Sequence, residues 1–394
     1  MKCIFNISVV LLITVVVVDP GGLIPGAKEI FFFLTIVVGL LKMQYIPKHI
    51  LFVSTTIGLL LPTLGLVLGI LADQAFSFDH SIGYYKSFLF VFLILVTYDK
   101  GVFIGDTFSK ITLLLAILTL IIASITGPYT GATDSIFPKE NVVVSRRAFG
   151  PLLIDPAVFY KTSPLLLFGI SYLCSQKMSV IKCILLLSCC VAMFVSGTRA
   201  NIFSTIIIIT YFLWDKVIKN NKVFRTLFFS IAIIIIVFAF PYVLGDVFFN
   251  KDEESLNIKL SLVDSYINLW NNYPMQLLFG SGTGSAMLNE RGLSYLLEPT
   301  YFELIRYFGI IAFPAVLFLL VLLPVYYFIK SYKTEQFNKV KYIVVAYLLY
   351  ISLEISSNPL LISSTGMIVY VVALSSAYSC NKILDNGRYI DGRI

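Results

Sequence analysis

Residues 180–214 read VIKCILLLSCCVAMFVSGTRANIFSTIIIITYFLW, two apolar runs separated by a short polar turn that contains Arg199. With some tilt, runs of this length can cross the roughly 30 Å of hydrocarbon in a bilayer as α-helices. An ionised guanidinium at a membrane boundary is costly unless it meets an anion. The stretch therefore predicts two membrane helices with an anion site at the turn between them.

The composition extends this prediction to the whole chain. Hydrophobic residues make up 58% and charged residues 13% of the sequence, too few polar side chains to cover a soluble globule of 394 residues. Continuous apolar runs must be helices in lipid, because an open sheet cannot satisfy its backbone there. Such runs lie near residues 3–18, 29–42, 50–72, 87–104, 110–126, 157–175, 180–197, 199–214, 226–249, 301–329, 342–357 and 360–380. The sequence predicts one all-α polytopic membrane domain over residues 1–394, with about twelve transmembrane helices.

The distribution of basic residues predicts the orientation. If the N-terminus is cytoplasmic, the inner segments carry 18 of the 29 lysine and arginine residues, as the positive-inside rule requires. Both termini are then cytoplasmic, and two long loops, 127–156 and 250–300, lie outside. The first apolar run ends in Asp19-Pro20 without a cleavage site, so we expect a retained helix.

Arginine and lysine are divided unevenly between the two sides. Arginine is only three of the 18 inner basic residues but five of the 11 outer ones, namely Arg146, Arg147, Arg199, Arg291 and Arg306. The planar guanidinium binds phosphate in a bidentate manner, whereas lysine is a hydrated point charge. The pattern predicts an outward-facing phosphate or diphosphate site. For Arg291 and Arg306, pairing with outer carboxylates is an equal alternative.

Histidine is rare, so no metal site is expected. Of His49 and His80, only His80 falls on the outer side. It is interpreted as an exposed loop residue, and a role as a catalytic base is the alternative.

Three segments resemble one family. Residues 196–201 (SGTRAN) resemble the Ser-Gly-Ser/Thr-Arg element that opens a helix in O-antigen ligases and O-antigen polymerases. Residues 146–156 (RRAFGPLLIDP) are similar to the family's arginine followed by a Gly-x-x-x-Asp/Asn-Pro type run. Residues 278–284 (LFGSGTG) and 298–311 (EPTYFELIRYFGII) resemble the glycine turn and helix entry of its large periplasmic loop. The order of these segments and their common outer side strengthen the resemblance.

Departures from the ligase pattern favour the polymerases. The ligase histidine is replaced by Glu298, and the arginine ahead of the glycine turn is matched only loosely by Lys259. O-antigen polymerase is the leading interpretation, and O-antigen ligase is the near alternative. A lipid-linked oligosaccharide flippase or another transporter is the alternative from a different class.

The resemblance implies a GT-C-like glycosyltransferase of lipopolysaccharide biosynthesis in the bacterial inner membrane, with neither metal nor cofactor. Its substrates would be undecaprenyl-diphosphate-linked oligosaccharides. Its other partners would be membrane lipid and a chain-length regulator protein, with no nucleic acid. Arg199, with Arg146 or Arg147, would stabilise the leaving diphosphate, and Glu298 would be the base. The remaining expected substrate-binding residues are Lys259, Gly280, Gly282, Tyr301 and Arg306. A plain flexible turn is the alternative for the two glycines.

Overall fold

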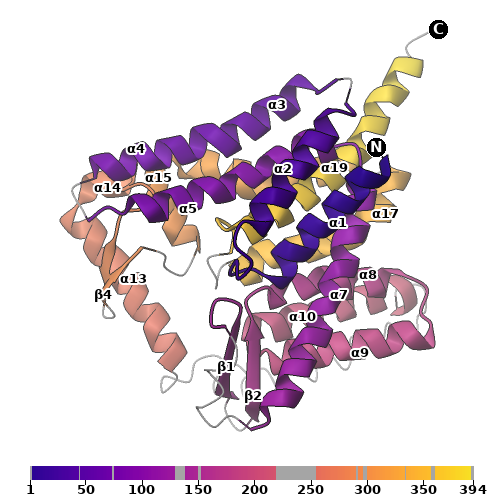
Figure 1. Cartoon of the computed structure of the whole chain (residues 1–394), viewed down its shortest axis with the longest axis horizontal. Coiled ribbons are helices and arrows are strands. Elements are labelled where there is room, and N and C mark those ends of the chain that lie inside the picture. The colour runs from indigo at the N-terminus through magenta and orange to yellow at the C-terminus, as the bar shows by residue number, and fades with distance from the viewer. Residues whose placement is uncertain are drawn as a thin grey trace. The chain divides into compact units, whose positions relative to one another are not determined.

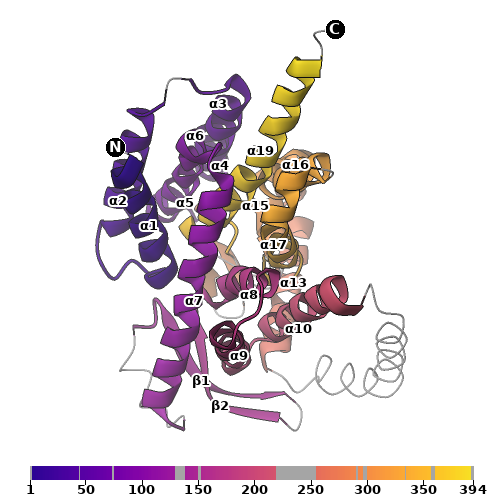
Figure 2. The same cartoon turned by 90° about the vertical axis from the view of Figure 1, so that its right-hand side faces the viewer.

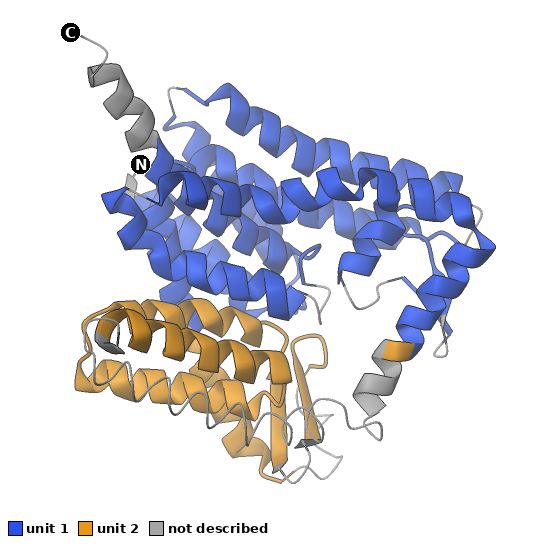
Figure 3. Ribbon diagram, turned by 180° about the vertical axis from the view of Figure 1, so that it is seen from behind, with its two compact units in different colours: residues 1–112, 261–394 blue, residues 113–260 orange. Residues whose placement is uncertain are grey.

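The computed structural model describes residues 2–43, 45–72, 75–128, 138–149, 152–218, 254–289, 292–295, 300–332, 334–355 and 360–391. Helices make up most of these residues, which confirms a mainly helical protein (Figure 1). The chain divides into two compact units, coloured separately in Figure 3. Unit 1 comprises residues 1–112 and 261–394, and unit 2 comprises residues 113–260.

Within the described ranges, four helices are long and apolar enough to cross a membrane. They are Lys48–Leu71, Phe78–Thr97, Gly101–Thr126 and Thr300–Ser331. Shorter apolar helices cover Cys3–Val18, Ser163–Ser175 and Val180–Val195. The predicted helix 226–249 lies outside the described residues. The total of twelve spans and the GT-C-like arrangement stay predictions.

The first part of unit 1 is built from long helices. Helices α1 and α2 pack side by side, and so do α4 and α5 (Figure 1). A π-turn at Thr56–Leu60 joins α3 to α4, and a 3-10 turn at Phe90–Leu93 joins α5 to α6. The bounds are α1 Lys2–Val18, α2 Ala27–Leu40, α3 Lys48–Thr55, α4 Leu61–Leu71, α5 Phe78–Leu89, α6 Ile94–Thr97 and α7 Gly101–Thr126.

The predicted fourth and fifth helices had wrong boundaries. The sequence placed one helix at 87–104, whereas the helix runs from Phe78 to Thr97 and the next begins at Gly101. The charged pair Asp99-Lys100 lies in the turn between them. The polar first turn of α5 concealed where this helix begins, and it contains His80, which was interpreted as a loop residue.

The second part of unit 1 begins at Ser261, within α13, and the described part of the predicted outer loop 250–300 contains secondary structure. Its described part holds two helices and a small β-hairpin before the late apolar helices begin. The bounds are α13 Glu254–Asn272, α14 Pro274–Phe279, β3 Met287–Asn289, β4 Gly292–Ser294, α15 Thr300–Leu317, α16 Leu323–Ser331, α17 Glu335–Leu349 and α19 Ser364–Asp391. Helix α19 packs against α16 and α17.

The helix Lys48–Leu71 has two contrasting faces. On one face Gly65 and Gly69 are buried and allow close approach of the chain near Thr283. The other face exposes large apolar side chains, which would be costly in water and are favourable against lipid. They are Leu51, Phe52, Leu60, Leu64, Val67, Ile70 and Leu71.

Helix α15 is broken at Gly309, whose φ of 74° and ψ of 161° are not helical. A break leaves backbone carbonyls that need donors, because lipid offers none. The amide of Ser281 donates to the carbonyl of Arg306 at 2.7 Å, and the amide of Gly282 donates to that of Tyr307 at 3.1 Å. The glycine turn 280–284 therefore packs into the break and satisfies it.

The glycines of this turn are needed for close packing. A Cβ on Gly282 would lie 1.9 Å from the amide nitrogen of Gly69, and one on Gly280 would lie 2.4 Å from the carbonyl oxygen of Tyr307. Both glycines also have positive φ, which disfavours other residues.

We expect Gly282→Ala to lower the free energy of unfolding by about 1–3 kcal/mol more than Gly127→Ala. Gly127 also has positive φ, but among the described residues no atom lies within 4 Å of the position that a Cβ would occupy there. Comparison of the two variants therefore separates the cost of overpacking from the cost of backbone strain, because both variants have the strain and only Gly282→Ala has the overpacking. Unfolding in mixed micelles titrated with dodecyl sulfate measures the difference. Equal values for the two variants would contradict the packing role.

Unit 2 contains α7 from Leu113 onward, followed by a β-hairpin and a group of helices (Figure 2). Strands β1 (Val142–Phe149) and β2 (Leu152–Tyr160) pair antiparallel, with a shift in register between Ser145 and Arg147. The helices are α8 Leu166–Ser175, α9 Val180–Val195 and α10 Arg199–Leu213.

The predicted helix 157–175 is wrong in its first part. Residues up to Tyr160 belong to β2, and α8 begins only at Leu166. The apolar residues at the end of β2 continue into those of α8, so the sequence showed one run. Pairing with β1 satisfies their backbone and makes the strand possible.

Candidate functional site

Arg199 occupies the first position of α10, directly after the turn that ends α9. The turn is possible because Gly197 has a positive φ of 62°. The hydroxyl of Ser196 donates to the carbonyl of Met193 at 2.6 Å and closes the last turn of α9. Arg199 is half-buried at this junction of two apolar helices, as the sequence predicted from the interruption of the two runs.

The β-hairpin brings a second arginine to the same turn. Arg147 of β1 donates from Nη1 to the carbonyl oxygen of Gly197 at 3.3 Å. The side chains of Arg147 and Ala157 lie so close to Gly197 that a Cβ there would be 3.0 Å from each. The hairpin at Arg147 and the turn at Gly197 are therefore in contact within unit 2.

Asn201 fixes the turn from the inside. Its side-chain amide donates to Ser196 Oγ at 2.8 Å and to Ser163 Oγ at 3.0 Å, and the residue is fully buried. This residue belongs to the SGTRAN segment but was given no role from the sequence. Its place between two serines that are far apart in the chain could not be read from spacing alone.

Arg146 differs from Arg147 in its surroundings. It is exposed, and its Nε lies 3.7 Å from the Asp155 carboxylate across the hairpin. An exposed pair of this kind contributes little to stability, roughly 0–1 kcal/mol. Of the two candidates, Arg147 is the one that contacts the turn before Arg199.

The electrostatics of this turn favour an anion. The N-terminus of a helix carries a partial positive charge, and a cation in its first turn is disfavoured by roughly 0.3–1 kcal/mol. Here Arg199 occupies that first turn, and the guanidinium of Arg147 contacts the carbonyl two residues earlier. A phosphate group at this position would be stabilised by the helix dipole and by two planar guanidinium groups.

Arg306 of unit 1 lies in a different environment, fully buried on α15 beside Glu303. Its Nε and Nη2 donate to the two carboxylate oxygens at 3.0 and 2.8 Å. Nη1 donates to the carbonyl and hydroxyl oxygens of Ser285 at 2.7 and 3.1 Å, and Nη2 also donates to the carbonyl of Tyr295 at 3.0 Å. An arginine has five N–H donors, and these contacts use all of them. Arg306 therefore anchors Ser285 and Tyr295 and has no donor left for a phosphate group.

Glu303 has a second partner in Tyr266 of α13. The phenol donates to Oε1 of Glu303 at 2.5 Å, and both residues are buried. Burial, together with the neighbouring carboxylate, raises the pKa of Tyr266 well above its ordinary value, so this phenol stays protonated and remains a donor. Arg306 thus pairs with a carboxylate, which was the alternative to a phosphate-binding role in the sequence analysis. The three-residue spacing from Glu303 to Arg306 was a usable signal for it.

Other predicted site residues have structural contacts or lie outside the described part. The hydroxyl of Tyr301 donates to the carbonyl of Ile351 at 2.5 Å. The amides of Gly280 and Gly282 donate to the carbonyls of Gln276 and Tyr307, so they hold the protein's own backbone. Lys259 lies on α13, but its side chain is outside the described part, as are Arg291 and Glu298.

The chain was compared with protein families, curated proteins and solved structures. No protein-family model, curated protein or solved structure matches the chain.

Proposed function

We propose that the protein is a membrane glycosyltransferase of the O-antigen polymerase type, acting on undecaprenyl-diphosphate-linked glycans at the periplasmic face. The observation that carries this proposal is the contact between the two arginine segments of unit 2. Arg147 reaches the turn that opens α10, and Arg199 is the first residue of that helix. A site of this composition suits a diphosphate.

The proposed reaction needs such a site because its leaving group is an anion. A hydroxyl oxygen of the acceptor sugar attacks the anomeric carbon of the growing chain. The bond from that carbon to the diphosphate oxygen breaks, the diphosphate leaves with the electron pair, and the hydroxyl proton passes to a base. Guanidinium groups that are already in place stabilise the negative charge as it develops on the leaving oxygen.

Arg199 and Arg147 are the proposed diphosphate ligands. Glu298 is the base proposed from the sequence, and it lies outside the described residues. A carboxylate is suited to accept the hydroxyl proton when its site is partly desolvated. A chain-length regulator remains a proposed partner, and the bacterial inner membrane remains the proposed location.

The lipopolysaccharide of a strain from which the gene has been deleted tests the proposal. A core that carries a single repeat unit is expected, because ligation continues when polymerisation stops. Bare core would contradict the proposal and indicate a ligase or a flippase. An unchanged ladder would contradict any role in O-antigen assembly.

The orientation gives a separate prediction for cysteine labelling. In a variant without the six native cysteines, Lys139→Cys and Leu288→Cys should react with a membrane-impermeant maleimide in intact cells. Lys177→Cys and Lys330→Cys should react only after permeabilisation. All four side chains are exposed, so accessibility does not bias the comparison. Labelling of position 288 only from the cytoplasm would place the loop on the wrong side for a periplasmic substrate.

A further inference from the structure

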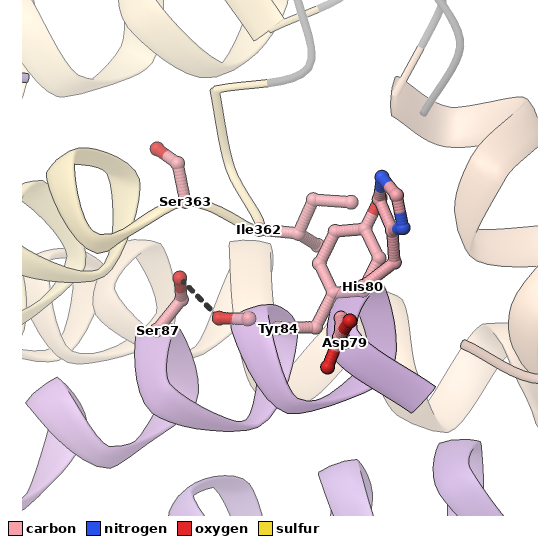
Figure 4. Close-up of a pocket in the computed structure, with 7 residues that line it drawn as sticks. Asp79, His80, Tyr84, Ser87, Ile362 and Ser363 are labelled. Atoms are coloured by element: carbon pink, nitrogen blue, oxygen red, sulfur yellow. Dashed lines mark hydrogen bonds between the residues drawn. The ribbon is translucent and has the colours of Figure 1, made fainter. Parts of the chain in front are cut away.

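Unit 1 contains a cavity of about 450 Å³ between the beginning of α5 and the segment that precedes α19 (Figure 4). Its size is in the range of small-molecule sites, roughly 300–1,000 Å³. It is lined by Asp79, His80, Tyr84, Ser87, Ile362 and Ser363, among other residues. Most of the accessible lining is apolar, and Asp79 and His80 add polar groups to it, so the cavity is suited to a ligand that has both an apolar face and hydrogen-bonding groups.

His80 is held at the cavity by two contacts. Its Nδ1 lies 2.9 Å from Ser77 Oγ, and its ring stacks on that of Tyr295 with 4.2 Å between centroids and 18° between planes. Among the described residues, Nε2 of His80 and the carboxylate of Asp79 have no hydrogen-bond partner. These polar groups are therefore available to a ligand.

The wall behind His80 is rigid because buried groups fix Tyr295. The carbonyl of Tyr295 accepts from Nη2 of Arg306 at 3.0 Å. The hydroxyls of Tyr84 and Tyr307 lie 3.2 and 3.0 Å from the same oxygen. The buried arginine of α15 thus fixes the backbone of the residue on whose ring His80 stacks.

The charge of the lining decides between two classes of ligand. In the described part of the chain, no lysine or arginine lines the cavity, and Asp79 is a carboxylate. A carboxylate repels a phosphate but accepts strong hydrogen bonds from hydroxyl groups. The rings of Tyr84 and His80 also offer apolar surface next to these polar groups. This combination suits a neutral sugar.

We infer that the cavity binds the glycan end of the acceptor substrate, with Asp79 and His80 contacting its hydroxyl groups. The inference rests on the proposed function for the identity of the sugar as an acceptor. Unit 1 then binds the sugar without contacting a diphosphate, and the proposed diphosphate site is in unit 2.

The test is binding of a soluble glycan by the purified full-length protein. The probe is the repeat-unit oligosaccharide released from its lipid diphosphate by mild acid, titrated by ligand-observed NMR. Asp79→Asn and His80→Gln should each weaken binding by about tenfold or more, as expected for loss of one hydrogen bond that involves a charged or polar ligand-facing group. Lys86→Gln is the matched control, because Lys86 is exposed on the same helix but is not among the residues that line the cavity.

The outcomes separate this inference from the proposed function. Wild-type affinity in both Asp79→Asn and His80→Gln, or no binding of the probe by the wild type, would overturn the sugar site. Polymer formation by the wild type, measured on lipid-linked substrate in the same preparations, tests the proposed function by itself. Loss of binding in Asp79→Asn and His80→Gln, but not in Lys86→Gln, would support the sugar site whatever the polymer assay shows.

Discussion

Replacing Arg306 by methionine is expected to lower the free energy of unfolding by about 3–5 kcal/mol, because it leaves the Glu303 carboxylate buried without its counter-charge. The two side chains are fully buried and joined at 2.8 Å. The variant also removes the donors that hold the carbonyls of Ser285 and Tyr295. Unfolding of the purified protein in dodecyl sulfate and mixed micelles measures the change.

The double variant Arg306→Met with Glu303→Leu is the matched control. Replacing both members of a buried ion pair by apolar residues is often neutral, so the double variant should recover part of the stability lost in the single one. Recovery should be incomplete, since Tyr266 also loses its acceptor. A double variant that is as unstable as the sum of two single changes would contradict a direct coupling of Arg306 and Glu303.

Arg199→Lys is expected to reduce polymerisation by about a hundredfold to a thousandfold. One point charge cannot reproduce the planar bidentate contact with a diphosphate, and loss of such a stabilising donor costs roughly 2.7–4 kcal/mol in the transition state. Because Arg199 is half-buried at a turn, expression and insertion should stay near normal. The measurement is the repeat-unit ladder, with protein abundance determined in the same cells.

Two further variants show whether polymerisation needs the guanidinium groups at this turn or only a positive charge near the hairpin. Arg147→Lys should also shorten the ladder, because Arg147 contacts the turn that opens α10. Lys161→Gln removes an exposed cation just after β2 and should leave the ladder unchanged. Long ladders from Arg199→Lys at normal abundance would show that this residue does not carry the chemistry.

Hydropathy alone was sufficient to predict the helical class of the protein and several of its apolar helices. The run 50–72 corresponds to Lys48–Leu71 and the run 301–329 to Thr300–Ser331, because long apolar stretches have few alternatives in lipid. Hydropathy could not predict the break at Gly309. A glycine within an apolar run is compatible with a straight helix, and only the amides of Ser281 and Gly282 make the break stable.

The candidate site was predictable to a similar extent. The position of Arg199 between two helices followed from the pattern of residues 180–214, and its chemistry followed from the guanidinium group. The pairing of Arg306 with Glu303 could be read from their three-residue spacing, whereas its bonds to Ser285 and Tyr295 depend on contacts that hydropathy does not specify. His80 was misplaced in a loop because the polar first turn of α5 has the composition of a loop.

Reconstitution is the decisive test of polymerase activity. The purified protein would be placed in liposomes that contain undecaprenyl-diphosphate-linked repeat units and no other protein. We expect a ladder of longer lipid-linked glycans, with one undecaprenyl diphosphate released for each transfer, and no ladder with the Arg199→Lys variant. Movement of intact repeat units across the bilayer without a ladder or released diphosphate would contradict it and indicate a transporter.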